Sequence, residues 1–129
     1  MIYIALLFLA PLKAVATNEP IMRVLIGKEN KARFRADGLE SFLVEGISSG
    51  QRRIKSLNLI YKDNKVKYSI NNNLDPSFEL PNNFILSIKN FGKRGIWFKN
   101  RRYSGELRVS LDNKKILIIN HLKLEKYLK

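Results

Sequence analysis

Residues 103–120, "YSGELRVSLDNKKILIIN", carry the strongest signal of secondary structure in the chain, because apolar and polar side chains alternate up to a turn. The residues expected to face inward are Tyr103, Gly105, Leu107, Val109 and Leu111. Those expected to face outward are Ser104, Glu106, Arg108 and Ser110. A period of two residues is typical of a half-buried strand. The polar "DNKK" predicts a turn, and "ILIIN" predicts a more fully buried returning strand.

The same kind of pattern recurs on the N-terminal side of this unit. Strands are predicted at 21–27, 41–46 and 84–88, and a β-hairpin at 57–70. Residues 71–83, rich in Asn and Pro, predict an irregular connection. Helical spacing occurs only at the end of the chain, in Leu124, Tyr127 and Leu128, with Glu125 placed to reach Lys129. The predicted fold class is mainly β, with antiparallel strands and hairpins and one short C-terminal helix.

The first residues have the features of a leader. Residues 2–12 form an apolar block shorter than the roughly 20 residues of a membrane-spanning helix, so no stable membrane span is expected. Ala14, Val15 and Ala16 supply the small residues that a signal peptidase requires. No Lys or Arg precedes the block, and a buried core segment is the alternative interpretation. We therefore predict a signal peptide at 1–16, one domain at 17–129, and export to the periplasm or cell envelope.

The composition is strongly basic. The chain has 24 Lys and Arg against 11 Asp and Glu, a formal net charge of +13 and a pI near 10.2. Such a field attracts polyanions, namely nucleic acid, anionic lipid or the acidic polymers of a bacterial wall. Abundant Lys, Ile and Asn could instead reflect a genome poor in G and C. Export favours wall polymer over nucleic acid, so no nucleic-acid partner is expected.

Several kinds of chemistry are excluded by residues that the chain lacks. The absence of Cys excludes disulfides, thiolate zinc sites and cysteine nucleophiles, and the single histidine, His121, excludes multi-histidine metal sites. There is no Gly-x-Ser-x-Gly elbow and no phosphate-binding glycine loop. We predict no metal and no cofactor.

Glycoside chemistry would need one or two carboxyl groups beside the scissile bond. The candidates are Glu106 and Glu125, each in a strongly patterned segment. Glu106 is expected to face outward, and Glu125 has Lys129 as an i+4 partner, so we interpret both as structural. No catalytic residue is assigned.

The segment "GKRGIWFKNRRYSG", residues 92–105, interleaves aromatic and basic side chains. Such a segment could hold single-stranded nucleic acid, with bases on the rings and phosphates on the cations, or a glycan. It is also typical of a strand with aromatics in the core and solvated cations, the interpretation that we favour. If the segment does bind a substrate, we predict that Trp97, Arg102 and Tyr103 are the binding residues.

Two parts of the chain resemble the domain shared by stage II sporulation protein D and the amidase enhancer LytB. The matching residues are Tyr103, Gly105, Leu107 and Val109, then Ile118, Ile119 and Asn120, then Leu124, Glu125, Tyr127 and Leu128. The strand at 21–27 resembles the one that opens that domain, whereas residues 28–95 match no motif of it. The resemblance implies an α+β full domain, and an exported peptidoglycan lytic transglycosylase or an enhancer of a wall amidase.

In that family a Gly-Val pair and the catalytic glutamate follow the Leu-Glu-x-Tyr-Leu motif, and this chain stops at Lys129. We therefore expect an N-terminal portion of the domain that is catalytically inactive, since Glu125 belongs to the motif and does not replace the missing acid. The alternative is a non-catalytic basic β module that binds peptidoglycan glycan strands or anionic wall polymer.

Overall fold

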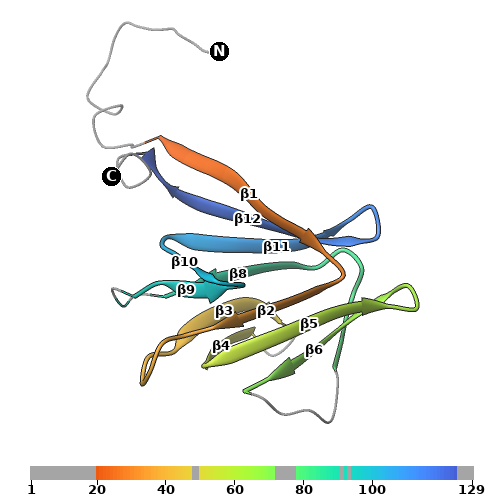
Figure 1. Ribbon diagram of the computed structural model, residues 1–129. Helices are drawn as coiled ribbons and strands as arrows, with labels where there is room; N and C mark the ends of the chain where they lie inside the picture. Colours follow the sequence, from red (N-terminus) through yellow and green to blue (C-terminus); the bar gives the residue numbers. More distant parts are fainter. Residues whose placement is uncertain (1–19, 48–49, 72–77, 91, 93, 125–129) are drawn as a thin grey trace, which may run out of the picture.

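The computed structural model describes residues 20–47, 50–71, 78–90, 92 and 94–124, which form two six-stranded antiparallel sheets (Figure 1). Sheet A has the order β1 (Ile21–Glu29), β12 (Lys115–Lys123), β11 (Glu106–Asp112), β8 (Ile85–Lys89), β3 (Phe42–Ile47) and β4 (Gly50–Ile54). Sheet B has the order β10 (Arg101–Tyr103), β9 (Ile96–Phe98), β2 (Lys31–Arg35), β5 (Ser56–Lys62), β6 (Lys65–Ile70) and β7 (Phe78–Leu80). The prediction of a mainly β, antiparallel fold is confirmed.

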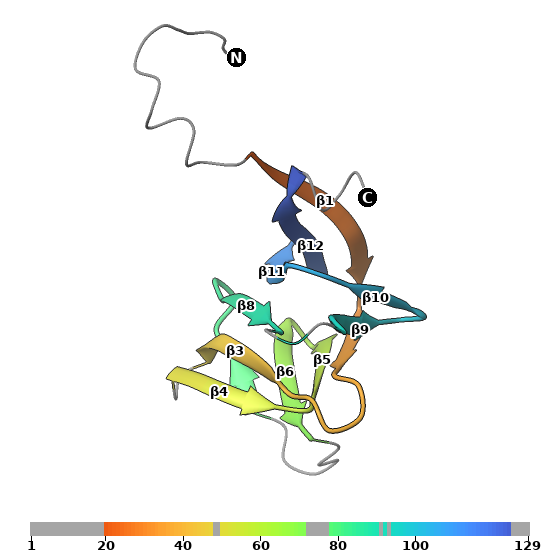
Figure 2. The same ribbon diagram turned by 90° about the vertical axis from the view of Figure 1, so that its left-hand side faces the viewer.

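The chain passes between the two sheets at short connections. Only Asn30 separates β1 from β2, only Lys55 separates β4 from β5, and Ser104 and Gly105 separate β10 from β11. Figure 2 shows β1 leading directly into β2 in this way. Corners of this kind allow one continuous core to form between two sheets.

The core consists of the inward-facing side chains of both sheets. Its largest fully buried members are Phe34, Phe42, Phe98, Leu57, Leu86, Ile88, Ile96, Leu107, Ile116 and Ile118. The rings of Phe34 and Phe98, on the paired strands β2 and β9, stack with their centroids 5.4 Å apart. Burying one such side chain stabilises the fold by about 1.5–3 kcal/mol.

The connection from β10 to β11 corrects one prediction. Residues 103–111 were expected to form a single strand, but β10 ends at Tyr103 in sheet B and β11 begins at Glu106 in sheet A. Gly105 lies at the corner with φ +84°, in the region that favours glycine. The buried amide of Asn120 donates to the carbonyl oxygens of Ser104 (2.8 Å) and Glu106 (3.2 Å), so it holds the corner from the neighbouring strand β12.

An asparagine holds the β4–β5 corner as well. The side-chain oxygen of Asn71 accepts hydrogen bonds from the backbone N–H groups of Lys55 (2.7 Å) and Ser56 (3.2 Å). The Asn71 side chain thus supplies an acceptor for two consecutive backbone N–H groups at the bend.

The predicted turns and most of the predicted strand faces agree with the structure. The hairpin at 57–70 is β5 and β6, joined by two residues of positive φ, as are β11 and β12. Leu107 and Val109 are buried as expected, and Tyr103 and Leu111 are partly buried against the core, whereas Gly105, also expected to face inward, is exposed at the corner. The predicted irregular connection at 71–83 was partly wrong, because Phe78–Leu80 pairs with β6 as β7.

Two predictions fall on other parts of the chain. The predicted signal peptide at 1–16 lies outside the described residues, as do positions 125–129 of the predicted C-terminal helix. In the part of the chain that the structure describes, there is no helix long and apolar enough to span a membrane.

Candidate functional site

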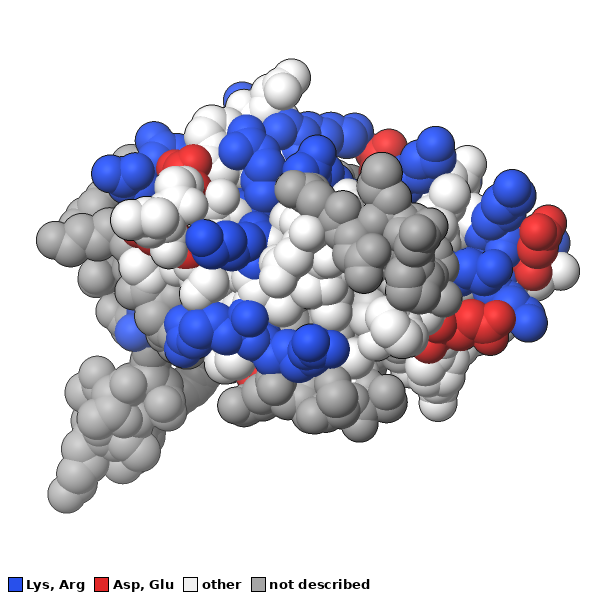
Figure 3. All heavy atoms as spheres, turned by 90° about the horizontal axis from the view of Figure 1, so that it is seen from below, with Lys and Arg blue, Asp and Glu red and all other residues white. Residues whose placement is uncertain are grey.

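The outward surface of sheet B carries a group of basic side chains that strand alternation and pairing bring together. We call it the basic face; its members are Lys31, Arg33, Arg35, Asn58, Ile60, Lys62, Lys65, Lys67, Ser69, Trp97 and Arg102. Every charged member is Lys or Arg, and the acids beside this face lie at its margins. They are Asp37, which pairs with Arg102, Glu79, which pairs with Lys65, and Asp63 in the β5–β6 turn. Figure 3 shows that Lys and Arg also far outnumber Asp and Glu on the side of the molecule seen from below.

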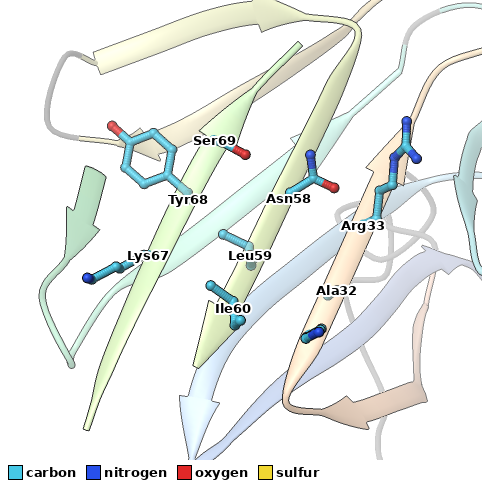
Figure 4. Close-up of a pocket in the computed structure, with 9 residues that line it drawn as sticks. Ala32, Arg33, Asn58, Leu59, Ile60, Lys67, Tyr68 and Ser69 are labelled. Carbon is cyan, nitrogen blue, oxygen red and sulfur yellow. The ribbon is translucent and has the colours of Figure 1, made fainter. Parts of the chain in front are cut away.

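Strand register places the members of the basic face in rows. Arg33 lies opposite Asn58, which lies opposite Ser69, so one row crosses β2, β5 and β6 (Figure 4). In the next row Ile60 lies between the exposed Lys31 and Lys67. These two rows line an open hollow of about 420 Å³, whose rim is basic and whose floor is polar and aliphatic.

Trp97 and Arg102, two of the residues predicted to bind substrate, meet at one edge of this face. They are directly opposed in the β9–β10 pair, and Trp97 also lies opposite Arg35 of β2. The guanidinium carbon of Arg35 lies 4.8 Å from the centroid of the Trp97 ring, and that of Arg102 lies 5.5 Å from it. Both contacts are within cation–π range.

The carboxylate of Asp37 fixes this group. Its Oδ1 accepts a 2.5 Å hydrogen bond from Trp97 Nε1, and its Oδ2 lies 3.5 Å from Arg102 Nη1. The bond to an ionised acceptor is stronger than one between neutral groups, and it restrains the indole ring. The Arg35, Trp97 and Arg102 cluster is therefore preorganised.

Tyr103, the third predicted site residue, does not join Trp97 and Arg102 on the basic face. It is the next residue after Arg102 in β10, so its side chain points to the opposite side of the sheet. There it packs partly buried against the core, with its ring centroid 6.5 Å from that of Phe98. At the sheet edge Tyr103 and Arg102 both line a separate hollow of about 300 Å³.

Sequence reasoning missed most of the basic face. The available signal was "KARFR", residues 31–35, in which the basic residues Lys31, Arg33 and Arg35 alternate with the buried Ala32 and Phe34. This pattern shows that the cations share one side of a strand. It does not show that Trp97 lies beside them.

A second hollow, of about 440 Å³, lies on the outward side of sheet A and contains Glu106 and His121. The two are opposed in the β11–β12 pair, and Glu106 is also opposed to Lys89. Glu106 Oε2 accepts hydrogen bonds from Ser87 Oγ and from Arg108 Nε, the latter at 3.1 Å.

The protonation states in this second hollow do not suit acid catalysis. Partial burial disfavours the charged form of Glu106, but the hydrogen bonds from Ser87 and Arg108 outweigh it and hold its pKa below the ordinary value. Burial, followed by the positive charge of Arg108, lowers the pKa of His121. At neutral pH Glu106 is thus an ion-paired carboxylate, whereas a general acid needs a proton to give.

The described residues contain no group of three His, Asp or Glu that could hold a metal ion. Comparisons with known proteins find no match, whether to family models, curated proteins or solved structures. The resemblance to the sporulation protein D domain therefore stays a prediction, and the arrangement of side chains carries the functional argument.

Proposed function

We propose that this chain is an exported wall-associated protein of the sporulation protein D and LytB kind, whose basic face holds peptidoglycan glycan strands or anionic wall polymer. The observation that carries the proposal is the gathering of Lys and Arg on the outward side of sheet B, with acids only at its margins. The predicted leader at 1–16 and the motifs at 21–27 and 96–128 support the wall as the place of action. A wall amidase is a further proposed partner, through the resemblance alone.

The dimensions of the basic face favour a polymer over a small ligand. It extends from β10 across β9, β2 and β5 to β6. Neighbouring strands are spaced about 4.8 Å apart, so the face is about 19 Å wide. A linear polymer can contact several cations of this face at once, and each contact is individually weak.

The electrostatics favour a charged polymer. Lys31, Arg35 and Lys67 form no ion pair with any acid of the described residues, so their charges are available to a ligand. Exposed charges interact through water and are screened by salt. Binding should therefore weaken steeply as ionic strength rises.

We propose binding and not bond cleavage for the described residues. The best placed carboxylate, that of Glu106, is held by Ser87 and Arg108. Any lytic or amidase-enhancing activity would have to involve other groups.

The test is sedimentation of the protein with purified cell-wall sacculi at a series of salt concentrations. The variant Lys31→Glu/Lys67→Glu reverses two charges on the basic face. Lys114→Glu/Lys115→Glu makes the same change in net charge at exposed positions of the β11–β12 turn. We expect the first variant to lose at least about tenfold in affinity, at about 1 kcal/mol or more for each charge, and the second to bind nearly as the parent does. Equal losses would show that net charge alone drives binding, and would refute a defined face.

A further inference from the structure

The Trp97 ring is not an open platform. Two guanidinium groups, those of Arg35 and Arg102, lie within cation–π distance of it, and Asp37 holds both the indole N–H and Arg102. Stacking of a sugar or a nucleobase requires a ring face that the ligand can reach. Such a ligand would first have to displace an arginine that is already in place.

The same arrangement prepares Arg35 to bind an oxyanion. A guanidinium that stacks on an aromatic ring keeps its N–H donors directed outward in a planar fork, which matches two oxygens of a phosphate. Arg35 has no carboxylate partner among the described residues, and its side chain is exposed. Its donors are therefore free to bind a ligand while the ring restrains their orientation.

Arg35 is also the last of a regular row. Lys31, Arg33 and Arg35 occupy alternate positions of β2, all on the basic face. Alternate residues of an antiparallel strand are about 6.8 Å apart. A row of evenly spaced cations suits a linear polymer that carries one negative charge in each short repeat.

We propose that the ligand of the basic face is a phosphodiester-linked polyol polymer, lying along β2 with one phosphate on Arg35. This inference rests on the proposed function and narrows it, because it excludes uncharged glycan strands as the main ligand. The covered Trp97 ring gives no base-stacking surface, which disfavours single-stranded nucleic acid. Carboxylate polymers lack the tetrahedral phosphate group and should bind less tightly.

The test uses the fluorescence of Trp97, the single tryptophan of the chain, in titrations at one fixed ionic strength. The probes are poly(glycerol phosphate), oligothymidylate and polyglutamate, all matched in charge, and an uncharged chitooligosaccharide. We expect poly(glycerol phosphate) to bind at least tenfold more tightly than any other probe. Equal binding by all three polyanions, or tighter binding of oligothymidylate or of the neutral glycan, would overturn the inference.

Two variants test the geometry of the cluster. Arg35→Lys keeps the charge but loses the planar fork, and Trp97→Leu removes the surface on which the guanidinium stacks. Each variant should bind poly(glycerol phosphate) at least fivefold more weakly than the parent protein. Because Trp97→Leu has no tryptophan, its affinity is measured by sedimentation or calorimetry instead of fluorescence. Arg53→Lys makes the same change as Arg35→Lys at an exposed position of β4 in sheet A, outside the basic face, and should change binding less than twofold. Unchanged binding by Arg35→Lys would overturn the inference.

The two proposals fail in different ways. If sacculi bind in a salt-sensitive manner but poly(glycerol phosphate) shows no preference, the phosphate inference is wrong and the proposed function stands. If neither sacculi nor any polyanion binds, the proposed function is wrong as well.

Discussion

Replacing Gly105 with Ala should destabilise the protein much more than the same change at Gly38. Both glycines have positive φ, +84° at Gly105 and +51° at Gly38, so both variants force an alanine into a left-handed conformation. This costs about 1–2 kcal/mol, of which about 0.4–1 kcal/mol is offset because alanine also restricts the unfolded chain. Gly38→Ala should therefore lower the free energy of unfolding by about 1 kcal/mol.

Gly105 has a second constraint that Gly38 lacks. A Cβ atom at Gly105 would lie 2.4 Å from the carbonyl oxygen of His121 and 3.0 Å from the Cβ of Leu122, whereas one at Gly38 would meet nothing within 4 Å. His121 and Leu122 belong to β12, which is hydrogen-bonded to β1 on one side and β11 on the other, so it cannot move away cheaply. Overpacking of this kind costs about 1–3 kcal/mol more. We expect Gly105→Ala to lower the free energy of unfolding by about 3 kcal/mol in total.

The assay is urea unfolding followed by the fluorescence of Trp97, with thermal unfolding by circular dichroism as a second probe. A difference of about 2 kcal/mol between the variants corresponds to a melting temperature about 6–8 °C lower for Gly105→Ala. Similar losses for the two variants, or a larger loss for Gly38→Ala, would refute the close approach of β12 to the corner and with it the geometry described for β10 and β11.

Three further changes test other features of the fold. Asn120→Leu should cost about 2 kcal/mol in urea unfolding, because the carbonyl oxygens of Ser104 and Glu106 lose their buried donor; a loss below about 0.5 kcal/mol would mean that water replaces the amide. Glu106 has a lowered pKa in the folded protein, so its contribution to the free energy of unfolding is present above the unfolded pKa and is lost as the pH falls through the folded pKa. Glu106→Gln should therefore flatten the acid limb of a plot of stability against pH. An unchanged acid limb would contradict the ion pair. Lys114→Gly, at φ +65° in the β11–β12 turn, should raise stability by about 0.5–1 kcal/mol in the same unfolding assay, and a loss would argue against the two-residue turn.

The motifs that suggested a wall-protein family have local structural roles in this chain. Gly105 and Asn120 form the β10–β11 corner, and Leu107 and Val109 are buried in the core. Such residues specify how a chain folds, whereas a functional assignment needs a site. This is why the basic face, most of which lies outside those motifs, carries the functional proposal.

The sequence did not predict strands β2, β4 and β7, but it did predict the mainly β class, the hairpin at 57–70, the turn at 112–115 and the side of β11 on which Leu107 and Val109 are buried. It did so because a period of two residues is a property of a single strand, and the turn residues act over a few positions. The alternation at 103–111 continues through the corner at Gly105. It therefore predicted one strand where the structure has two, β10 in sheet B and β11 in sheet A.

The pairing of strands that are distant in the sequence could not be predicted from local patterns and is known from the three-dimensional structure. Residues 31–35 and 96–98 are far apart in the sequence, yet β2 pairs with β9, and this pairing places Arg35 against Trp97. The pairing of β9 with β10 likewise places Arg102 against Trp97, whereas the inward direction of Tyr103 was already predicted from the alternation of the sequence. The physical reason is that alternation fixes the direction of a side chain relative to its own strand. The choice of neighbouring strand depends on how all the buried side chains pack together.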